Sequence, residues 1–206
     1  MCGFLHTPIV ITLPEVYPNE VQALHALAEN GAEIIHLRKP GISESRMCGY
    51  LEQVDPAIRH RLTIHYAPQL ANGFGLGGIH AKPEQTRKIT GSFRRSASSH
   101  AWTEVRSLAG HADYVFLSPV FDSVSKRGYK AAFTGGQLET QLADRNRPAV
   151  VALGGIAASN MALVRGWGFE GVAAIGSIWA VRNGAIDIEQ TVAHYTALTT
   201  AWNRTK

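Results

Sequence analysis

The chain has 206 residues, of which 45% are hydrophobic and 17% are charged. This length suits one domain with a substantial core, and the composition excludes an intrinsically disordered chain. The formal net charge is +4, but Lys and Arg are scattered along the sequence without interleaved aromatic residues. That pattern argues against a nucleic-acid partner and is compatible with an anionic small molecule as ligand.

The remaining composition features concern the cell compartment. No apolar stretch approaches the roughly 20 residues of a transmembrane helix, and the N-terminus lacks the pattern of a secretory signal. We therefore expect a cytoplasmic protein with no membrane partner. The cysteines, Cys2 and Cys48, have no metal-binding spacing and are expected to be free thiols.

Short apolar runs alternate with helical segments along the whole chain. The first strand is expected at residues 9–13, ended by Pro14, and the first helix runs from about Asn19 to a stop at Asn30 and Gly31. Further strands are expected at 34–37, 62–65, 78–80, 94–98, 113–117, 150–153 and 171–175. Helices are expected at 43–54, after Pro83, at 103–109, from a cap at Ser159 or Asn160, and at 188–202.

These alternating units predict the fold class. Strands that are apolar on both faces and separated by helices form parallel sheets. Eight such strands within residues 1–206, with no linker between them, predict a single-domain (β/α)8 TIM barrel. An open doubly wound sheet is the alternative, and the lack of a GxGxxG motif after the first strand disfavours its nucleotide-binding version.

Two glycine-containing loops predict a phosphate site. In a TIM barrel the ligand lies at the carboxyl ends of the strands, and phosphate commonly binds the loops after the seventh and eighth strands. Those loops contain Gly154-Gly155 and Ile175-Gly176-Ser177. Glycine allows backbone N–H groups to approach an oxyanion, so we expect phosphorylated small-molecule substrates here. The alternative is that the glycines only close the turns.

The loop after the sixth strand offers further phosphate ligands. Ser123 and Ser125 supply hydroxyl groups, and Lys126 supplies a positive charge. A solvated basic turn is the alternative interpretation of this segment.

Other strand ends carry an arginine and four histidines. Arg38 is a candidate for bidentate phosphate binding, and its alternative is an ion pair with a carboxylate such as Glu84. The histidines follow different strands, so no local spacing indicates a metal site, and no metal ligand is assigned. These histidines are His36, His65, His80 and His100.

Several segments together resemble one known family. They are His36-Leu37-Arg38-Lys39-Pro40, Gly78-Ile79-His80, Ser98-Ser99-His100, residues 112–126, Ala152-Leu153-Gly154-Gly155-Ile156 and residues 171–175. In these segments, and over nearly its whole length, the chain resembles thiamine phosphate synthase and its relative, the TenI thiazole tautomerase. The resemblance implies a (β/α)8 barrel that joins hydroxymethylpyrimidine diphosphate to a thiazole phosphate and releases pyrophosphate, usually with Mg²⁺.

The resemblance also implies roles for individual residues. The expected catalytic residues are Arg38 and Lys126, which would hold the diphosphate, and Ser98, which would bond the pyrimidine. For the thiazole phosphate, the resemblance implies Ser123, Ser125, Gly155, Ile175 and Gly176 as substrate-binding residues. His36, Lys39 and His65 are further substrate-binding candidates, at positions where the chain departs from the family. Tryptophans would cover the barrel exterior or form a contact between copies of the chain, so a homo-oligomer is a candidate state.

The chain departs from the family at the metal-binding positions. The two aspartates of the family correspond to Tyr66 and Gln85, and a family lysine corresponds to Pro40, next to Lys39. Because Mg²⁺ is normally held by carboxylate oxygens, we expect no Mg²⁺ ligand from the protein. The alternatives to a synthase are a TenI-like thiazole phosphate isomerase, with a base supplied by a histidine, and a non-catalytic binder of thiazole or thiamine phosphates.

Overall fold

The computed structural model describes residues 5–65, 67–121 and 134–204 of the chain. Eight parallel strands form a closed barrel in chain order, in which β1 is hydrogen-bonded to both β2 and β8. The predicted TIM barrel is therefore confirmed. The strands are β1 (Ile9–Ile11), β2 (Ile35–Leu37), β3 (Leu62–His65), β4 (Gly78–Ala81), β5 (Arg94–Ser99), β6 (Tyr114–Leu117), β7 (Ala149–Leu153) and β8 (Gly171–Ala174).

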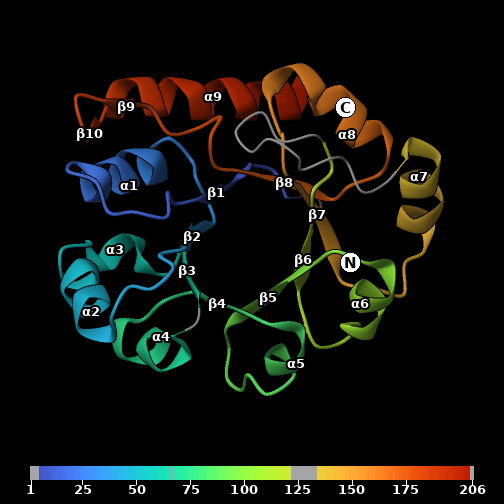
Figure 1. Ribbon diagram of the computed structural model, residues 1–206, viewed down its shortest axis with the longest axis horizontal. Coiled ribbons are helices and arrows are strands. Elements are labelled where there is room, and N and C mark those ends of the chain that lie inside the picture. Colours follow the sequence, from blue (N-terminus) through green and yellow to red (C-terminus); the bar gives the residue numbers. More distant parts are fainter. Residues whose placement is uncertain (1–4, 66, 122–133, 205–206) are drawn as a thin grey trace.

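Helices surround the barrel as an outer ring (Figure 1). They are α1 (Glu20–Glu29), α2 (Glu44–Glu52), α3 (Pro56–Arg59), α4 (Pro68–Phe74), α5 (Pro83–Thr86), α6 (Trp102–Ser107), α7 (Gly135–Ala143), the 3-10 turn η1 (Ala158–Asn160), α8 (Met161–Gly166) and α9 (Ile188–Arg204). A short hairpin of β9 (Val181–Arg182) and β10 (Ala185–Ile186) precedes α9.

The sequence pattern missed α3, α4, α7 and the hairpin. Helix α4 buries only Leu70 and Ala71, so it has no clear apolar periodicity. Helix α7 begins with two glycines, which are weak helix formers. Its start depends on a capping box, in which the Thr134 hydroxyl accepts from the Gln137 N–H and the Gln137 amide oxygen accepts from the Thr134 N–H.

Two apolar layers stabilise the barrel. The larger layer lies between the strands and the helices and includes Leu24, Ile35, Leu51, Val115 and Val150. A smaller cluster consists of Ile9, Ile11, Ile34, Tyr114, Phe116, Ala149, Val151 and Ala173. Alternate residues of each strand point to opposite faces, so one layer fills the barrel interior and the other holds the helices against it.

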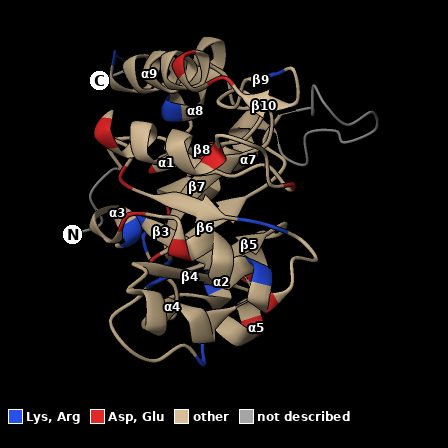
Figure 2. Cartoon of the chain, turned by 90° about the vertical axis from the view of Figure 1, so that its left-hand side faces the viewer, with Lys and Arg blue, Asp and Glu red and all other residues tan. Residues whose placement is uncertain are grey.

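The surface carries both signs of charge. On the face shown in Figure 2, Lys and Arg residues are interspersed with Asp and Glu residues and do not form a single stripe. Among the described residues, no helix has the length and apolar character needed to cross a bilayer.

Candidate functional site

One side of the barrel interior is polar. The smaller apolar cluster takes most of its residues from β1, β6, β7 and β8. By contrast, β2 to β5 contribute buried polar side chains to the interior: His36, Thr63, His65, His80 and Ser96. The strand register pairs His65 with His80, His80 with Ser96, and Ser96 with Tyr114. Residues distant in sequence therefore become neighbours across adjacent strands.

Three imidazole rings converge in this polar side. The His36 Nδ1 atom lies 2.9 Å from His65 Nε2, and its Nε2 atom lies 2.6 Å from the Tyr114 hydroxyl. The His80 ring stacks on His65 with centroids 4.1 Å apart, and its Nδ1 atom lies 2.9 Å from Ser96 Oγ. This convergence has no local signature in the sequence, because each ring comes from a different strand.

Burial keeps these rings neutral. Loss of hydration, followed by the nearby charges of His80 and Arg38, lowers the pKa of His65 to about 2. Burial and then Arg38 lower the pKa of His80 to about 3, and burial lowers the pKa of His36 well below its ordinary value. Histidines with such pKa values are poor general bases, so His36 and His65 do not suit the base role considered for an isomerase.

Two of the expected catalytic residues border the histidines. The Arg38 guanidinium lies close enough to His65 and His80 for its charge to lower the pKa of both. Among the ion pairs of the described residues, none joins Arg38 to Glu84, so that alternative for Arg38 is not supported. The Ser98 hydroxyl lies 3.1 Å from His80 Nε2. The substrate contacts of Arg38 and Ser98 stay predictions.

The ammonium group of Lys39 is bound by protein groups. Its buried ammonium forms an ion pair with Glu20 and donates to the carbonyls of Leu13 at 2.8 Å and Glu15 at 2.7 Å. Glu20 also accepts from the Tyr50 hydroxyl at 2.8 Å. Every donor of this ammonium has a protein partner, and the substrate-binding role expected for Lys39 stays a prediction. Neighbouring side chains on a strand point to opposite faces, and His36 takes the inward direction on β2.

The loops after β7 and β8 lie side by side, because Leu153 at the end of β7 pairs with Ala173 of β8. Gly154 and Gly155 both have positive φ angles, 97° and 67°. The Asn160 side chain donates to the Gly155 carbonyl at 2.8 Å and accepts from the Ala157 N–H. Asn160 therefore stabilises the loop after β7, and its side chain does not cap α8 as the sequence suggested.

The loop after β8 has open space and an unsatisfied hydroxyl. Nothing lies within 4 Å of the position that a Cβ atom would take at Gly176, and Ile175 is only half-buried. The buried Oγ of Ser177 has no hydrogen-bond partner among the described residues. An open backbone beside an unpartnered hydroxyl is what a bound oxyanion would complete.

The loop after β6 approaches the same place. The Val120 N–H donates to the Leu153 carbonyl at 3.1 Å, and the Phe121 N–H donates to the Gly154 carbonyl at 3.2 Å. The expected ligands Ser123, Ser125 and Lys126 lie outside the described residues, as does Tyr66. Their roles stay predictions, although the segment that contains them begins directly after Phe121.

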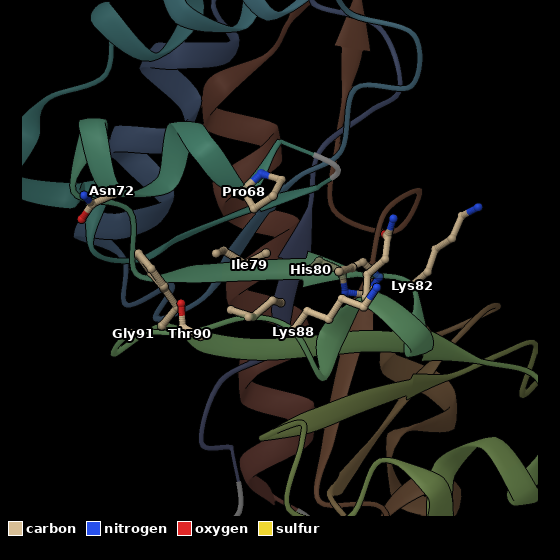
Figure 3. A pocket seen from close by; sticks show the side chains of 12 residues that line it. Pro68, Asn72, Ile79, His80, Lys82, Lys88, Thr90 and Gly91 are labelled. Atoms are coloured by element: carbon tan, nitrogen blue, oxygen red, sulfur yellow. The ribbon is translucent and has the colours of Figure 1, made fainter.

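A pocket of about 700 Å³ adjoins one of the three histidines, His80 (Figure 3). It lies along β4 and α5, and Ile79 and Phe93 contribute to its apolar lining. Figure 3 shows His80, Lys82 and Lys88 toward one end of the pocket and Asn72 and Gly91 toward the other. The sequence analysis did not identify Lys82 and Lys88 as pocket residues, because isolated lysines form no pattern that indicates a binding site.

The family of the chain follows from its match to a protein-family model. The model described as "Thiamine monophosphate synthase" matches residues 9–178, which include all eight strands. The chain belongs to the thiamine monophosphate synthase family. This membership confirms the resemblance stated above.

Two curated thiamine-phosphate synthases match part of the chain. The chain is 35% identical to the thiamine-phosphate synthase of Anoxybacillus flavithermus over 109 residues, which are 52% of this chain and 50% of the relative. It is 33% identical to that of Bacillus velezensis over 109 residues, 52% of this chain and 49% of the relative. The chain thus spans about half the length of the curated relatives it matches.

Among solved structures, the thiamine phosphate pyrophosphorylase of Bacteroides thetaiotaomicron superposes with a TM-score of 0.81 and 25% identity, covering 97% of this chain and 99% of that one. The Pyrococcus furiosus thiamine phosphate pyrophosphorylase has a TM-score of 0.76 at 20% identity, covering 97% and 96%. The second likeness supports the fold alone.

The residues present do not fit the Mg²⁺ that the family implies. Gln85 is an exposed amide, and the one group of three or more metal-ligating side chains among residues 5–65, 67–121 and 134–204 is formed by His36, His65 and His80. Mg²⁺ prefers oxygen ligands and is usually held by carboxylates. No carboxylate belongs to this group, so we assign no step of the reaction to protein-bound Mg²⁺.

Proposed function

We propose that the chain is a transferase of the thiamine phosphate synthase type, which joins hydroxymethylpyrimidine diphosphate to a thiazole phosphate. The observation that carries this proposal is the pair of loops after β7 and β8. Gly155 and Gly176 follow neighbouring strand ends there, and Ser177 Oγ has no partner in the part of the chain that the structure describes. Family membership supports the identity of the phosphorylated substrates.

The thiazole phosphate would bind at these two loops. Backbone N–H groups near Gly155, Ile175 and Gly176 would donate to the phosphate oxygens, and the Ser177 hydroxyl would add one more donor. Ser123 and Ser125 would complete the site from the loop after β6.

The pyrimidine diphosphate would bind at the opposite, polar side of the barrel. Arg38 borders the histidine cluster there, and its guanidinium matches phosphate oxygens bidentately. As the bond between the pyrimidine methylene and the diphosphate breaks, negative charge grows on the leaving pyrophosphate. Arg38 and Lys126 would stabilise that charge, Ser98 would orient the pyrimidine, and the thiazole nitrogen would attack the methylene carbon.

A specific observation favours one alternative. By the resemblance, Tyr66 and Gln85 stand at the family's metal-binding positions, whereas the glycines of the proposed thiazole phosphate loops are present. A TenI-like isomerase of the thiazole phosphate, or a binder of thiazole or thiamine phosphates, needs only the retained half. His36 and His65 are poor bases, so an isomerase would depend on the exposed His100, whose Nδ1 atom donates to the Ser118 carbonyl at 2.7 Å.

A reaction with both substrates separates these functions. The protein is incubated with hydroxymethylpyrimidine diphosphate and thiazole phosphate, with Mg²⁺ or with EDTA, and thiamine phosphate and pyrophosphate are quantified. A synthase forms both products in equal amounts, and Arg38→Met reduces the rate while Arg46→Met, an exposed arginine on α2, does not. Rearrangement of the thiazole phosphate alone, or binding without any product, would contradict the synthase proposal.

A further inference from the structure

We propose that His36, His65 and His80 form a three-imidazole site for a transition-metal cation of the Zn²⁺ type inside the mouth of the barrel. One nitrogen from each ring lies within 4.8 Å of the others, and all three side chains are buried. The rings come from the adjacent strands β2, β3 and β4, whose backbones are fixed by barrel hydrogen bonds. The site does not depend on the proposed function.

The donor set selects the class of metal. Neutral imidazole nitrogens suit Zn²⁺, Co²⁺, Ni²⁺ and Cu²⁺, whereas Mg²⁺ and Ca²⁺ require oxygen. Three protein ligands with one open position is the usual arrangement of a Zn²⁺ site that also binds water or a substrate. The three imidazoles therefore indicate a cation of a different class from Mg²⁺.

The spacing needs small ring movements. In a tetrahedral site with Zn–N bonds of about 2.0–2.1 Å, two ligand nitrogens lie about 3.4 Å apart. The His36 Nδ1 and His65 Nε2 atoms are 2.9 Å apart, so these two rings would separate slightly. His65 and His80 are stacked with an interplanar angle of 23°, so one of them would turn to aim its nitrogen at the cation.

Existing hydrogen bonds would hold two of the rings in their ligating tautomers. His36 would bind the metal through Nδ1 and donate its Nε2–H to the Tyr114 hydroxyl, which lies 2.6 Å away. His80 would keep its Nδ1–H bond to the buried Ser96 hydroxyl and offer Nε2, which would give up its contact with the Ser98 hydroxyl, now 3.1 Å away. Metal-bound histidines usually donate their second nitrogen to such a partner. His65 would bind through Nε2. Both nitrogens of the His36–His65 hydrogen bond then bind the metal, so the proton between them moves to the other nitrogen of the ring that carries it. No net proton is released.

The fourth position faces the polar mouth. His36 is fully buried, whereas His65 retains 7% exposure and His80 lines the pocket beside α5. Arg38 lies near His65 and His80, so a fourth ligand would sit beside a fixed positive charge. A water molecule or a phosphate oxygen meets that requirement.

A Co²⁺ titration of the full chain tests the site without reference to catalysis. One equivalent of Co²⁺ should produce the strong visible absorption of four-coordinate cobalt, and Zn²⁺ should displace it. His36→Asn and His65→Asn should abolish this spectrum, Tyr114→Phe should weaken Co²⁺ affinity about 10-fold, and the exposed His111→Asn should change nothing. A weak octahedral spectrum, or a strong one that survives both cluster substitutions, would overturn the proposal.

A second measurement uses the unaltered chain, in case the cluster variants fail to fold. Long-range ¹H–¹⁵N spectra of the imidazoles are recorded before and after one equivalent of Zn²⁺ is added. One nitrogen in each of the three buried rings should move to the metal-bound range. Shifts confined to the exposed histidines would contradict the site, and either result stands whether or not thiamine phosphate is formed.

Discussion

The His36 Nδ1 and His65 Nε2 atoms lie 2.9 Å apart inside the barrel, and His36 Nε2 lies 2.6 Å from the Tyr114 hydroxyl. A continuous hydrogen-bonded chain thus joins β6, β2 and β3 across the interior. In the metal-free protein these polar groups satisfy one another, which allows them to be buried among apolar residues such as Phe116.

Replacing His36 by Leu should destabilise the metal-free protein. Tyr114 and His65 would each lose a buried partner, and an unsatisfied buried group costs about 1–3 kcal/mol. The free energy of unfolding in urea measures the loss. The exposed His111→Leu is the control and should change stability by less than about 0.5 kcal/mol. Equal effects of the two substitutions would contradict the described hydrogen-bonded chain.

Lys39 should prove structural. Lys39→Met leaves the Glu20 carboxylate buried without its ion pair, which costs about 3–5 kcal/mol. The double variant Lys39→Met, Glu20→Met should recover much of that loss, because it removes both buried charges. Urea unfolding measures stability, and calorimetry measures thiazole phosphate affinity. A single variant with full stability and lost affinity would support the substrate-binding role.

Tyr50 should make the protein sensitive to alkaline pH. Burial, reinforced by the charge of Glu20, raises the pKa of Tyr50 well above its ordinary value of 10. The folded state therefore keeps the phenol proton where the unfolded state loses it, so the free energy of unfolding falls as pH rises above about 10. Tyr50→Phe should have a shallower decline between about pH 9 and 11. Lys39 is present in both proteins, so its own titration cancels in the comparison, and identical slopes would refute the prediction.

Gly154 should be more sensitive to substitution than another glycine of similar backbone conformation. Gly154 and Gly110 have φ angles of 97° and 73°, so alanine is strained at both, by about 1–2 kcal/mol. A Cβ atom at Gly154 would also stand 3.1 Å from the Pro119 Cα atom, whereas nothing lies within 4 Å at Gly110. Gly154→Ala should therefore lower the melting temperature more and weaken thiazole phosphate binding. Similar behaviour of the two variants would show that the contact with Pro119 is unimportant.

Most strands were predictable from the sequence because they are short apolar runs. Strand β5 has little apolar character, and it was predictable only from its place in the alternation of strands and helices. The histidine cluster was not predictable, since its contacts depend on register between β2, β3 and β4. The ion pair of Lys39 was likewise hidden, because its partner Glu20 lies on a helix and is buried there against the usual preference of glutamate. Ser177 stood within a predicted phosphate loop, but only the structure identifies its hydroxyl as unpartnered.

The most direct measurement is a calorimetric titration with thiazole phosphate of the unaltered chain, Ser177→Ala and the surface control Ser107→Ala. A hydrogen bond to a charged group contributes about 1.5–3 kcal/mol. We expect one site in the unaltered chain, affinity about 10-fold weaker or more in Ser177→Ala, and no change in Ser107→Ala. Failure of the unaltered chain to bind thiazole phosphate, or equal affinity in all three proteins, would contradict a phosphate site between the loops after β7 and β8.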